Sequence, residues 1–402
     1  MTELDPSPQK RLGSLDGLRG YAALVVVIYH CLLLNLTFGN LDNAATWRRV
    51  SSGASSLFLF SPLHDLWNGT EAVSVFFVIS GLVLVRSFLN KPRGGEARRW
   101  ESFYPKRLIR LYVPIIASLA LALVVVSIIA RRTLPTGSYQ FNILALGNTP
   151  AIAFHDLVFL PEGQHLNAPL WSMRPELACS LLLPLYVMVC RPNRIRPIVK
   201  LGLFSLIIVA ATQPRVSLSL DHHGLAHFGA YLALMGAFGC GGVLAATQES
   251  LSRRFDGWST WSWILLLGAA LVGMNTFWTF VGFGVESPVI LGLGQAITVE
   301  SAVLLTFVIL TWRRQALLLT DPFSKWLGQR SFSLYLVHFP IVLAIATLIG
   351  PENVWAVLAL GIAASLLAAE AFYRVVEHPS HLLAQRVGQI VQRRPIARRA
   401  SE

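Results

Sequence analysis

Arg19 and His30 lie on one face of a long apolar segment. They are eleven residues apart, and at 100° per residue the helix returns to within about 20° of the same direction over a rise of roughly 16 Å. A fixed cation would therefore stand at one end of the segment, with a titratable nitrogen deeper along it. Imidazole exchanges protons near neutral pH, but a packing histidine bonded to a neighbouring helix would fit the same position. Arg19 also suits an ordinary anchor at a membrane surface.

Two further pairs of residues suit an anionic ligand with a narrow arm. Ser80 and Gly81 lie in the middle of an apolar segment, where small side chains allow either close helix packing or passage of a narrow ligand. Arg107 and Arg110 share one helix face near the start of the next segment. Guanidinium groups bind phosphate through paired hydrogen bonds, so this pair suits a phosphorylated ligand or anionic lipid headgroups.

Polar residues also open a later segment at the expected external interface. Trp171 suits an interfacial anchor, and Ser172 follows it directly. Glu176 should lie just inside the membrane, where its carboxylate would accept a hydrogen bond from a substrate hydroxyl. Pairing of Glu176 with Arg174 or with another helix is the alternative.

Tyr335 and His338 are three residues apart and should point in the same direction. His338 should lie at a depth similar to that of His30. Glu300 and Glu370 are further acids in apolar segments, and each would suit pairing with a buried arginine or histidine. We assign neither of them a catalytic role.

Metal and disulfide chemistry find no support in the spacing of the other reactive residues. The four cysteines lie in or beside apolar runs without metal-binding spacing, which predicts buried thiols. The histidines in the expected external segments show no metalloprotease pattern, and no nucleophile-elbow motif is present. We therefore expect no metal cofactor.

Composition predicts the elements that position these residues. Of the 402 residues, 54% are hydrophobic and only 13% are charged, against about 25% charged in a soluble domain. This excludes a disordered protein, a coiled coil and a disulfide scaffold. We predict an all-α, polytopic integral membrane protein with about ten transmembrane helices. The apolar runs are 20–36, 72–89, 108–130, 172–190, 198–212, 225–247, 261–280, 289–312, 332–349 and 354–376.

Basic residues predict the orientation. With the N-terminus in the cytoplasm, ten spans place 27 Lys and Arg on the cytoplasmic side and 6 on the other, as the positive-inside rule requires. We expect a multi-pass protein of the inner (plasma) membrane, in contact with membrane lipids and with both termini cytoplasmic. The net charge of +12 then needs no nucleic acid. The expected organisation is a cytoplasmic tail at 1–11, a transmembrane domain at 12–380 and a basic cytoplasmic tail at 381–402.

Several motifs, in chain order, resemble the acyltransferase-3 family of membrane O-acyltransferases. The resemblance covers residues 12–380, nearly the whole chain. Two positions depart from the family pattern, because Ser180 and Phe332 stand where tyrosines are usual. The matching motifs are Leu15-Asp16-Gly17-Leu18-Arg19-Gly20 with Tyr29-His30, Phe76 to Gly81, Arg107 with Arg110, Leu170-Trp171-Ser172 with Glu176 and Pro184, Ser331 to Pro340, and Glu377 with Pro379.

The resemblance implies transfer of an acyl group, usually acetyl, from cytoplasmic acyl-CoA to a hydroxyl of an envelope carbohydrate or glycolipid. A secondary metabolite such as a macrolide sugar is an alternative acceptor. The acyl chain length and the oligomeric state are left open.

The same resemblance assigns roles to the residues already singled out. His30, as general base or acyl carrier, would be catalytic together with Arg19, Glu176 and His338. His338 and Tyr335 would orient His30 or donate to an oxyanion. The donor would bind at Arg19, Arg107, Arg110, Ser80 and Gly81, and the acceptor at Trp171, Ser172, Glu176 and Tyr335.

Two alternatives are kept beside this interpretation. A transporter or flippase of a glycan or lipid would also have ten spans and buried charges, although no repeat of broken helices is visible. An acyltransferase fold that has lost catalysis is the other alternative, and the presence of both Arg19 and His30 argues against it.

Overall fold

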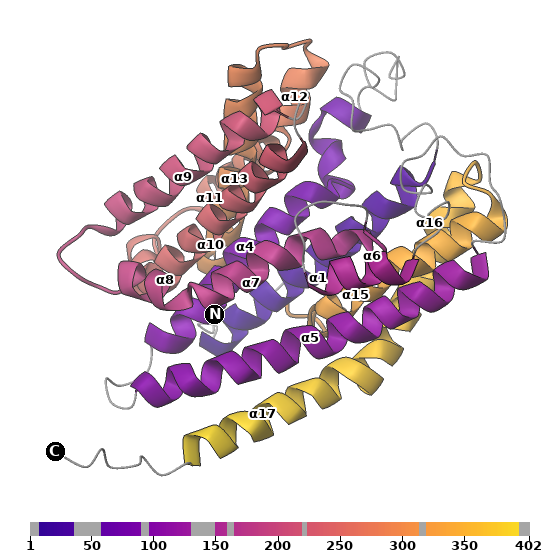
Figure 1. Ribbon diagram of the computed structural model, residues 1–402. Helices are drawn as coiled ribbons and strands as arrows, with labels where there is room; N and C mark the ends of the chain where they lie inside the picture. The colour runs from indigo at the N-terminus through magenta and orange to yellow at the C-terminus, as the bar shows by residue number, and fades with distance from the viewer. Residues whose placement is uncertain are drawn as a thin grey trace.

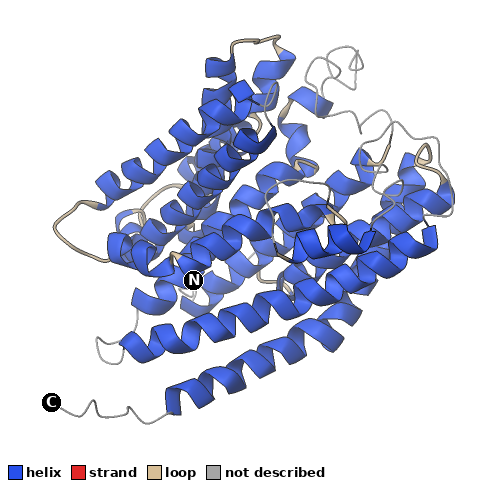
Figure 2. Ribbon diagram, in the orientation of Figure 1, coloured by secondary structure: helices blue, strands red, loops and turns tan. Residues whose placement is uncertain are grey.

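The computed structural model describes residues 8–35, 58–89, 96–129, 149–158, 165–218, 223–312 and 319–393. These residues are almost entirely helical and contain no strand (Figure 2), which confirms the all-α prediction. The longer helices, in chain order, are α1 (Pro8–Leu33), α4 (Gly69–Leu89), α5 (Glu96–Ile129), α9 (Pro197–Leu218), α10 (His223–Arg254), α13 (Pro288–Thr311), α15 (Pro322–Ile349), α16 (Val354–Phe372) and α17 (His378–Arg393). The shorter elements are η1 (Pro62–Leu66), α6 (Thr149–Leu157), η3 (Ala168–Ser172), α7 (Met173–Leu181), α8 (Leu183–Cys190), α11 (Thr260–Met274), α12 (Thr276–Gly282) and η4 (Tyr373–Glu377).

In the described ranges, seven helices are long and apolar enough to cross a membrane, or nine if each of two bent pairs counts as one span. The first bent pair joins η3 and α7 to α8 at 61°, and the second joins α11 to α12 at 55°. The predicted segment 198–212 corresponds to the shorter apolar helix Pro197–Gln213. The described parts of all ten predicted apolar runs are thus largely helical, but the runs 172–190 and 261–280 are each divided by a bend. The polytopic architecture is confirmed, with seven to nine candidate spans in the described ranges.

Glycines let two pairs of helices approach closely. Where α1 crosses α15, a Cβ added at Gly20 would lie 2.7 Å from the backbone nitrogen of Gly328. Where α4 crosses α10, a Cβ at Gly81 would overlap the carbonyl oxygen of Phe238. Any larger residue at these positions would push the two backbones apart, because the atoms in the way belong to the main chain. The glycines thus fix α1 against α15 and α4 against α10.

Helix α15 contains a proline, and a residue outside the helix replaces the hydrogen bond that the proline removes. Pro340 has no N–H, so the carbonyl of Leu336, four residues earlier, loses its helical donor. The Asn167 Nδ2 atom, just before η3, donates to that oxygen at 2.8 Å. Asn167 is fully buried. This hydrogen bond fixes the start of the bent span against the middle of α15.

The C-terminal helix continues well beyond the last predicted span. Helix α16 runs through η4 into α17, and residues 354–392 form one continuous candidate span. Helix α17 lies along α5 (Figure 1). The expected boundary at residue 380 therefore falls inside a helix, because helical structure persists to Arg393. The tail segments 1–7 and 394–402 lie outside the described residues.

Candidate active site

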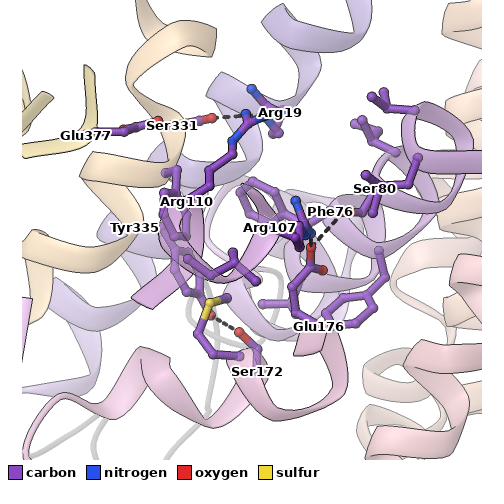
Figure 3. Close-up of a pocket in the computed structure, with 18 residues that line it drawn as sticks. Arg19, Phe76, Ser80, Arg107, Arg110, Ser172, Glu176, Ser331, Tyr335 and Glu377 are labelled. Atoms are coloured by element: carbon purple, nitrogen blue, oxygen red, sulfur yellow. Dashed lines mark hydrogen bonds and ion pairs between the residues drawn. The ribbon is translucent and has the colours of Figure 1, made fainter. Parts of the chain in front are cut away.

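A cavity opens among α1, α4, α5, α7, α15 and η4 (Figure 3). Its empty volume, including the part open to the outside, is about 930 Å³. The walls combine apolar side chains with three arginines and two glutamates. The lining residues are Arg19, Val73, Phe76, Phe77, Ile79, Ser80, Val83, Leu84, Arg107, Arg110, Leu111, Ser172, Met173, Glu176, Ser331, Phe332, Tyr335 and Glu377.

Most of the residues singled out from the sequence meet at this cavity. Those that line it are Arg19, Ser80, Arg107, Arg110, Ser172, Glu176 and Tyr335. Four others lie outside the lining, namely His30, Gly81, Trp171 and His338. Gly81 faces α10 and its backbone, so the helix-packing interpretation of this residue fits the structure.

Glu176 is the centre of a polar cluster on one wall. Its Oε1 atom accepts hydrogen bonds from Ser80 Oγ, at 2.9 Å, and from the Arg107 guanidinium. Both members of the ion pair are only 12% exposed. Arg107 Nε also donates to Ser180 Oγ at 3.0 Å. In Figure 3 the Ser80 and Arg107 side chains point at the same Glu176 oxygen.

The charged partner of Glu176 lies on another helix. From the sequence we expected this carboxylate to accept a hydrogen bond from a substrate hydroxyl, with pairing to Arg174 or to another helix as the alternative. The structure shows pairing with another helix, because the carboxylate meets Arg107 of α5. Spacing within its own span could not identify that partner.

The other two arginines are more open to a ligand. Arg110 is exposed and, within the described ranges, has no hydrogen bond or ion pair, although Glu377 lies close enough to act on its charge. Arg19 donates through Nε to Ser331 Oγ at 2.9 Å and pairs with Asp16 at 3.4 Å. Glu377 is itself held by Ser333 Oγ at 2.5 Å. Arg19 Nη2 also donates to the Gly328 carbonyl at 3.3 Å. Arg110 therefore offers more free N–H groups to an anion than Arg19 or Arg107 does.

Phe76 and Tyr335 close the inner end of the cavity. Their rings meet edge to face, with centroids 5.7 Å apart. The Tyr335 hydroxyl donates to the Pro169 carbonyl at 2.9 Å and lies 2.7 Å from Ser172 Oγ. The Ser172 hydroxyl also lies within hydrogen-bond distance of the Pro169 carbonyl. Both hydroxyl protons are therefore used in bonds among Ser172, Tyr335 and Pro169 (Figure 3). Tyr335 thus has no proton left to donate to a developing oxyanion.

The two predicted histidines lie together beyond this end. His338 Nε2 is 3.2 Å from His30 Nδ1, which is the match in depth expected from the sequence. Each Nδ1 also contacts the carbonyl four residues earlier, Val26 for His30 and Leu334 for His338, both at 2.9 Å. A carbonyl only accepts, so both Nδ1 atoms carry hydrogen. A neutral His338 then has no further N–H to donate, while His30 Nε2 keeps a free lone pair.

Trp171 belongs to a separate aromatic contact. It is half-buried and stacks on Tyr231 of α10, with ring centroids 6.4 Å apart. Arg174, one turn on, donates to the Tyr231 hydroxyl at 3.1 Å. The Nε and Nη2 atoms of Arg174 are buried and have no hydrogen-bond partner in the part of the chain that the structure describes. Trp171 therefore lies beside the Arg174 guanidinium, two of whose nitrogens have no partner among the described residues, and does not line the cavity.

Sequence reasoning missed a contact between a histidine and a buried aspartate. His165 Nδ1 lies 2.6 Å from Asp156 Oδ1, and the backbone N–H groups of Leu166 and Asn167 donate to Oδ2. The Asp156 side chain is fully buried, whereas that of His165 is 23% exposed. The two residues are nine apart in the sequence, and no helical or strand periodicity predicts such a contact.

The remaining candidates lie away from the cavity. Glu370 pairs with Arg330 and Arg374, which fits the expectation of a buried acid with arginine partners. Glu300 is on α13, which contributes no residue to the lining. The four cysteines are buried free thiols, as predicted. Within the described ranges, no group of three His, Cys, Asp or Glu residues is arranged to hold a metal ion.

Comparison with known proteins gives three findings. Residues 12–374 match the model of a family described as "Acyltransferase domain". The peptidoglycan O-acetyltransferase OatA of Listeria monocytogenes serovar 1/2a is 25% identical over 396 residues, which are 92% of this chain and 56% of that protein. The acyltransferase MdmB of Streptomyces mycarofaciens is 29% identical over 193 residues, which are 46% of this chain and 42% of that protein. The chain thus spans about half the length of these relatives. No solved structure matches.

Proposed function

The chain belongs to the acyltransferase family whose model covers residues 12–374. On that premise we propose that it is a membrane O-acyltransferase, and we propose its donor, its base and its acceptor. The donor is cytoplasmic acyl-CoA, most simply acetyl-CoA. The acceptor is a hydroxyl of a cell-envelope carbohydrate or glycolipid. The cavity, with an uncommitted arginine at its side and a histidine pair beyond its end, is the single observation that carries this proposal.

Charge and shape support an acyl-CoA donor. Arg110 and Arg19 would bind the phosphates, because both line the cavity and guanidinium groups bind phosphate through paired hydrogen bonds. The pantetheine arm would run along Ser80 toward Phe76. From the sequence we expected Arg107 to bind the donor. We now propose that it holds the Glu176 carboxylate in place, because its guanidinium pairs with that carboxylate.

The free lone pair of His30 Nε2 supports its role as general base. The acceptor oxygen attacks the thioester carbonyl carbon while its proton passes to Nε2. The carbon–sulfur bond then breaks, and the CoA thiolate takes the proton back from the imidazolium. His338 would orient His30 through the contact at 3.2 Å and would not donate to the oxyanion. The alternative, acylation of His30 before transfer, uses the same nitrogen as nucleophile.

Topology and acceptor complete the proposal. The protein would lie in the inner (plasma) membrane with both termini cytoplasmic, so that the donor cavity opens to the compartment in which acyl-CoA is made. The acceptor would approach from the external side, near Ser172 and Trp171. The name of one relative points to peptidoglycan as an acceptor class, and a secondary metabolite is the alternative.

Exchange of His30 for alanine tests this proposal. We would follow release of CoA from acetyl-CoA by the purified protein in detergent, with membrane extract as acceptor, and identify the labelled product. Loss of general-base catalysis should lower the rate by roughly 10²- to 10⁴-fold. His155→Ala, on α6 outside the cavity, is the matched control and should retain the wild-type rate.

Three outcomes are informative. A folded His30→Ala protein that transfers acetyl at the wild-type rate would refute the assignment of the base. Labelled acetyl that remains on wild-type protein after acid quenching, and is absent from His30→Ala, would favour the acyl-carrier alternative. A wild type that leaves acetyl-CoA intact with every acceptor fraction would contradict the proposed donor.

A further inference from the structure

The cavity wall on α4 continues toward the end of the helix that we assign to the cytoplasmic side. Ser80, Val83 and Leu84 line the cavity. Val83 is 41% exposed, so the wall is open at this level. One turn on, the same helix face presents Ser87, which is exposed, and Phe88, which is half-buried.

Helix α5 forms a matching stripe on the opposite side. Arg107 and Leu111 line the cavity. At the preceding turns the same face carries Phe103 and then Trp100, both half-buried. Trp100 precedes Arg107 by seven residues, or roughly 10 Å along the helix.

The aromatic side chains of the two stripes meet. Phe88 and Trp100 stack nearly parallel, with ring centroids 3.9 Å apart and an interplanar angle of 12°. Phe103 contacts Phe88 edge to face at 5.4 Å. Tyr104, beside Phe103, donates to the Leu181 carbonyl at the bend of the span that holds Glu176. The aromatic cluster Phe88–Trp100–Phe103 therefore joins the two stripes next to the residues that line the cavity.

We propose that this aromatic cluster binds the adenine ring of the CoA donor. The inference rests on the proposed function, since it takes the donor to be an acyl-CoA. Adenine follows the pyrophosphate by one ribose. On α5, Phe103 and Trp100 of the cluster precede Arg110, which we assign to the phosphates, by about two to three helical turns. An aromatic surface stacks on a nucleobase, whereas a phosphate or a pantetheine arm gains nothing from it.

Charge around the cluster fits a nucleotide that bears an additional phosphate on its ribose. The chain from Arg86 to Arg110 contains eight lysines and arginines, and this segment holds the cluster. Arg107 and Arg110 lie on the cavity side of it. The site thus combines a π-surface with cations on the same stretch of chain, which is how proteins bind nucleotides without reading the base by hydrogen bonds.

A ligand without the adenosine distinguishes adenine binding by the aromatic cluster from a purely structural role of the cluster. We would titrate CoA and 4′-phosphopantetheine, which lacks the adenosine, into the purified full-length protein in detergent and measure both dissociation constants. Trp100→Leu keeps an apolar contact with Phe88 but removes the aromatic surface. It should weaken CoA binding roughly 5- to 150-fold and leave 4′-phosphopantetheine binding within about 2-fold of the wild type.

Trp100→Phe is the conservative control and should restore most of the CoA affinity. Trp258→Leu, at an exposed turn between α10 and α11, should alter neither constant. Equal weakening of both ligands by Trp100→Leu, or no weakening of either, would overturn the adenine site and leave the donor assignment standing. A wild type that binds neither ligand would refute the acyl-CoA donor and this inference with it.

Discussion

Exchange of Arg107 for glutamine should destabilise the protein more than exchange of Glu176. Each side chain is 12% exposed, so the values measured for buried ion pairs apply, and loss of one partner costs about 3–5 kcal/mol. Arg107→Gln leaves a carboxylate with Ser80 as its remaining partner, and we expect about 3 kcal/mol. In Glu176→Gln the amide oxygen can still accept hydrogen bonds from Ser80 and Arg107. The Arg107 cation also remains accessible to anions in the cavity, so we expect a loss of stability of about 1.5 kcal/mol.

The double variant measures the interaction itself. With Arg107→Gln and Glu176→Gln combined, two neutral side chains face each other, and the loss should be about 2.5 kcal/mol, which is a coupling of about 2 kcal/mol. The measurement is the free energy of reversible unfolding in mixed detergent micelles for the wild type and the three variants. Losses that add to within about 0.5 kcal/mol would show that carboxylate and guanidinium do not interact, and the account of the polar cluster would be wrong.

Two further predictions concern a buried acid and the closed end of the cavity. Burial, with a contribution from the charge of Glu71, raises the pKa of Asp65 from 3.8 to about 7. The folded state therefore favours the protonated acid and loses stability as pH rises between these values. Asp65→Asn should gain about 3 kcal/mol over the wild type between pH 4.5 and pH 8, and an equal difference at both pH values would contradict this. Phe76→Ala opens the contact with Tyr335, so its rate with butyryl-CoA relative to acetyl-CoA should rise at least about 10-fold; an unchanged ratio would remove Phe76 from the acyl site.

Hydropathy predicted the fold, and helical spacing predicted several residues that lie together at the site. Each apolar run was recovered because a membrane span requires a long run of apolar residues whatever its partners are. Arg19 and His30 both contact α15, through Ser331 and His338. Their spacing is a property of one helix, so it survives assembly.

What spacing could not predict depends on how helices pack against one another. The partner of Glu176 stayed open, because Arg107 stands on α5, 69 residues earlier in the chain. Gly81 and Ser80 are adjacent in sequence but face α10 and the cavity respectively. Which of two neighbours faces a ligand is decided by the packing of α10, which spacing within α4 does not encode.

The order in which the chain is made divides the site into two parts. Glu176 follows Ser80 by 96 residues and Arg107 by 69, so this cluster is complete once α7 has emerged. Ser331, the partner of Arg19, is synthesised 312 residues later, and His338, the partner of His30, is synthesised 308 residues later. During synthesis the first half can neutralise its own buried carboxylate within the membrane. The contact between His30 and His338 can form only after α15 has been inserted, so a ribosome-bound or truncated chain that ends before α15 has a partly formed cavity and a His30 without this contact.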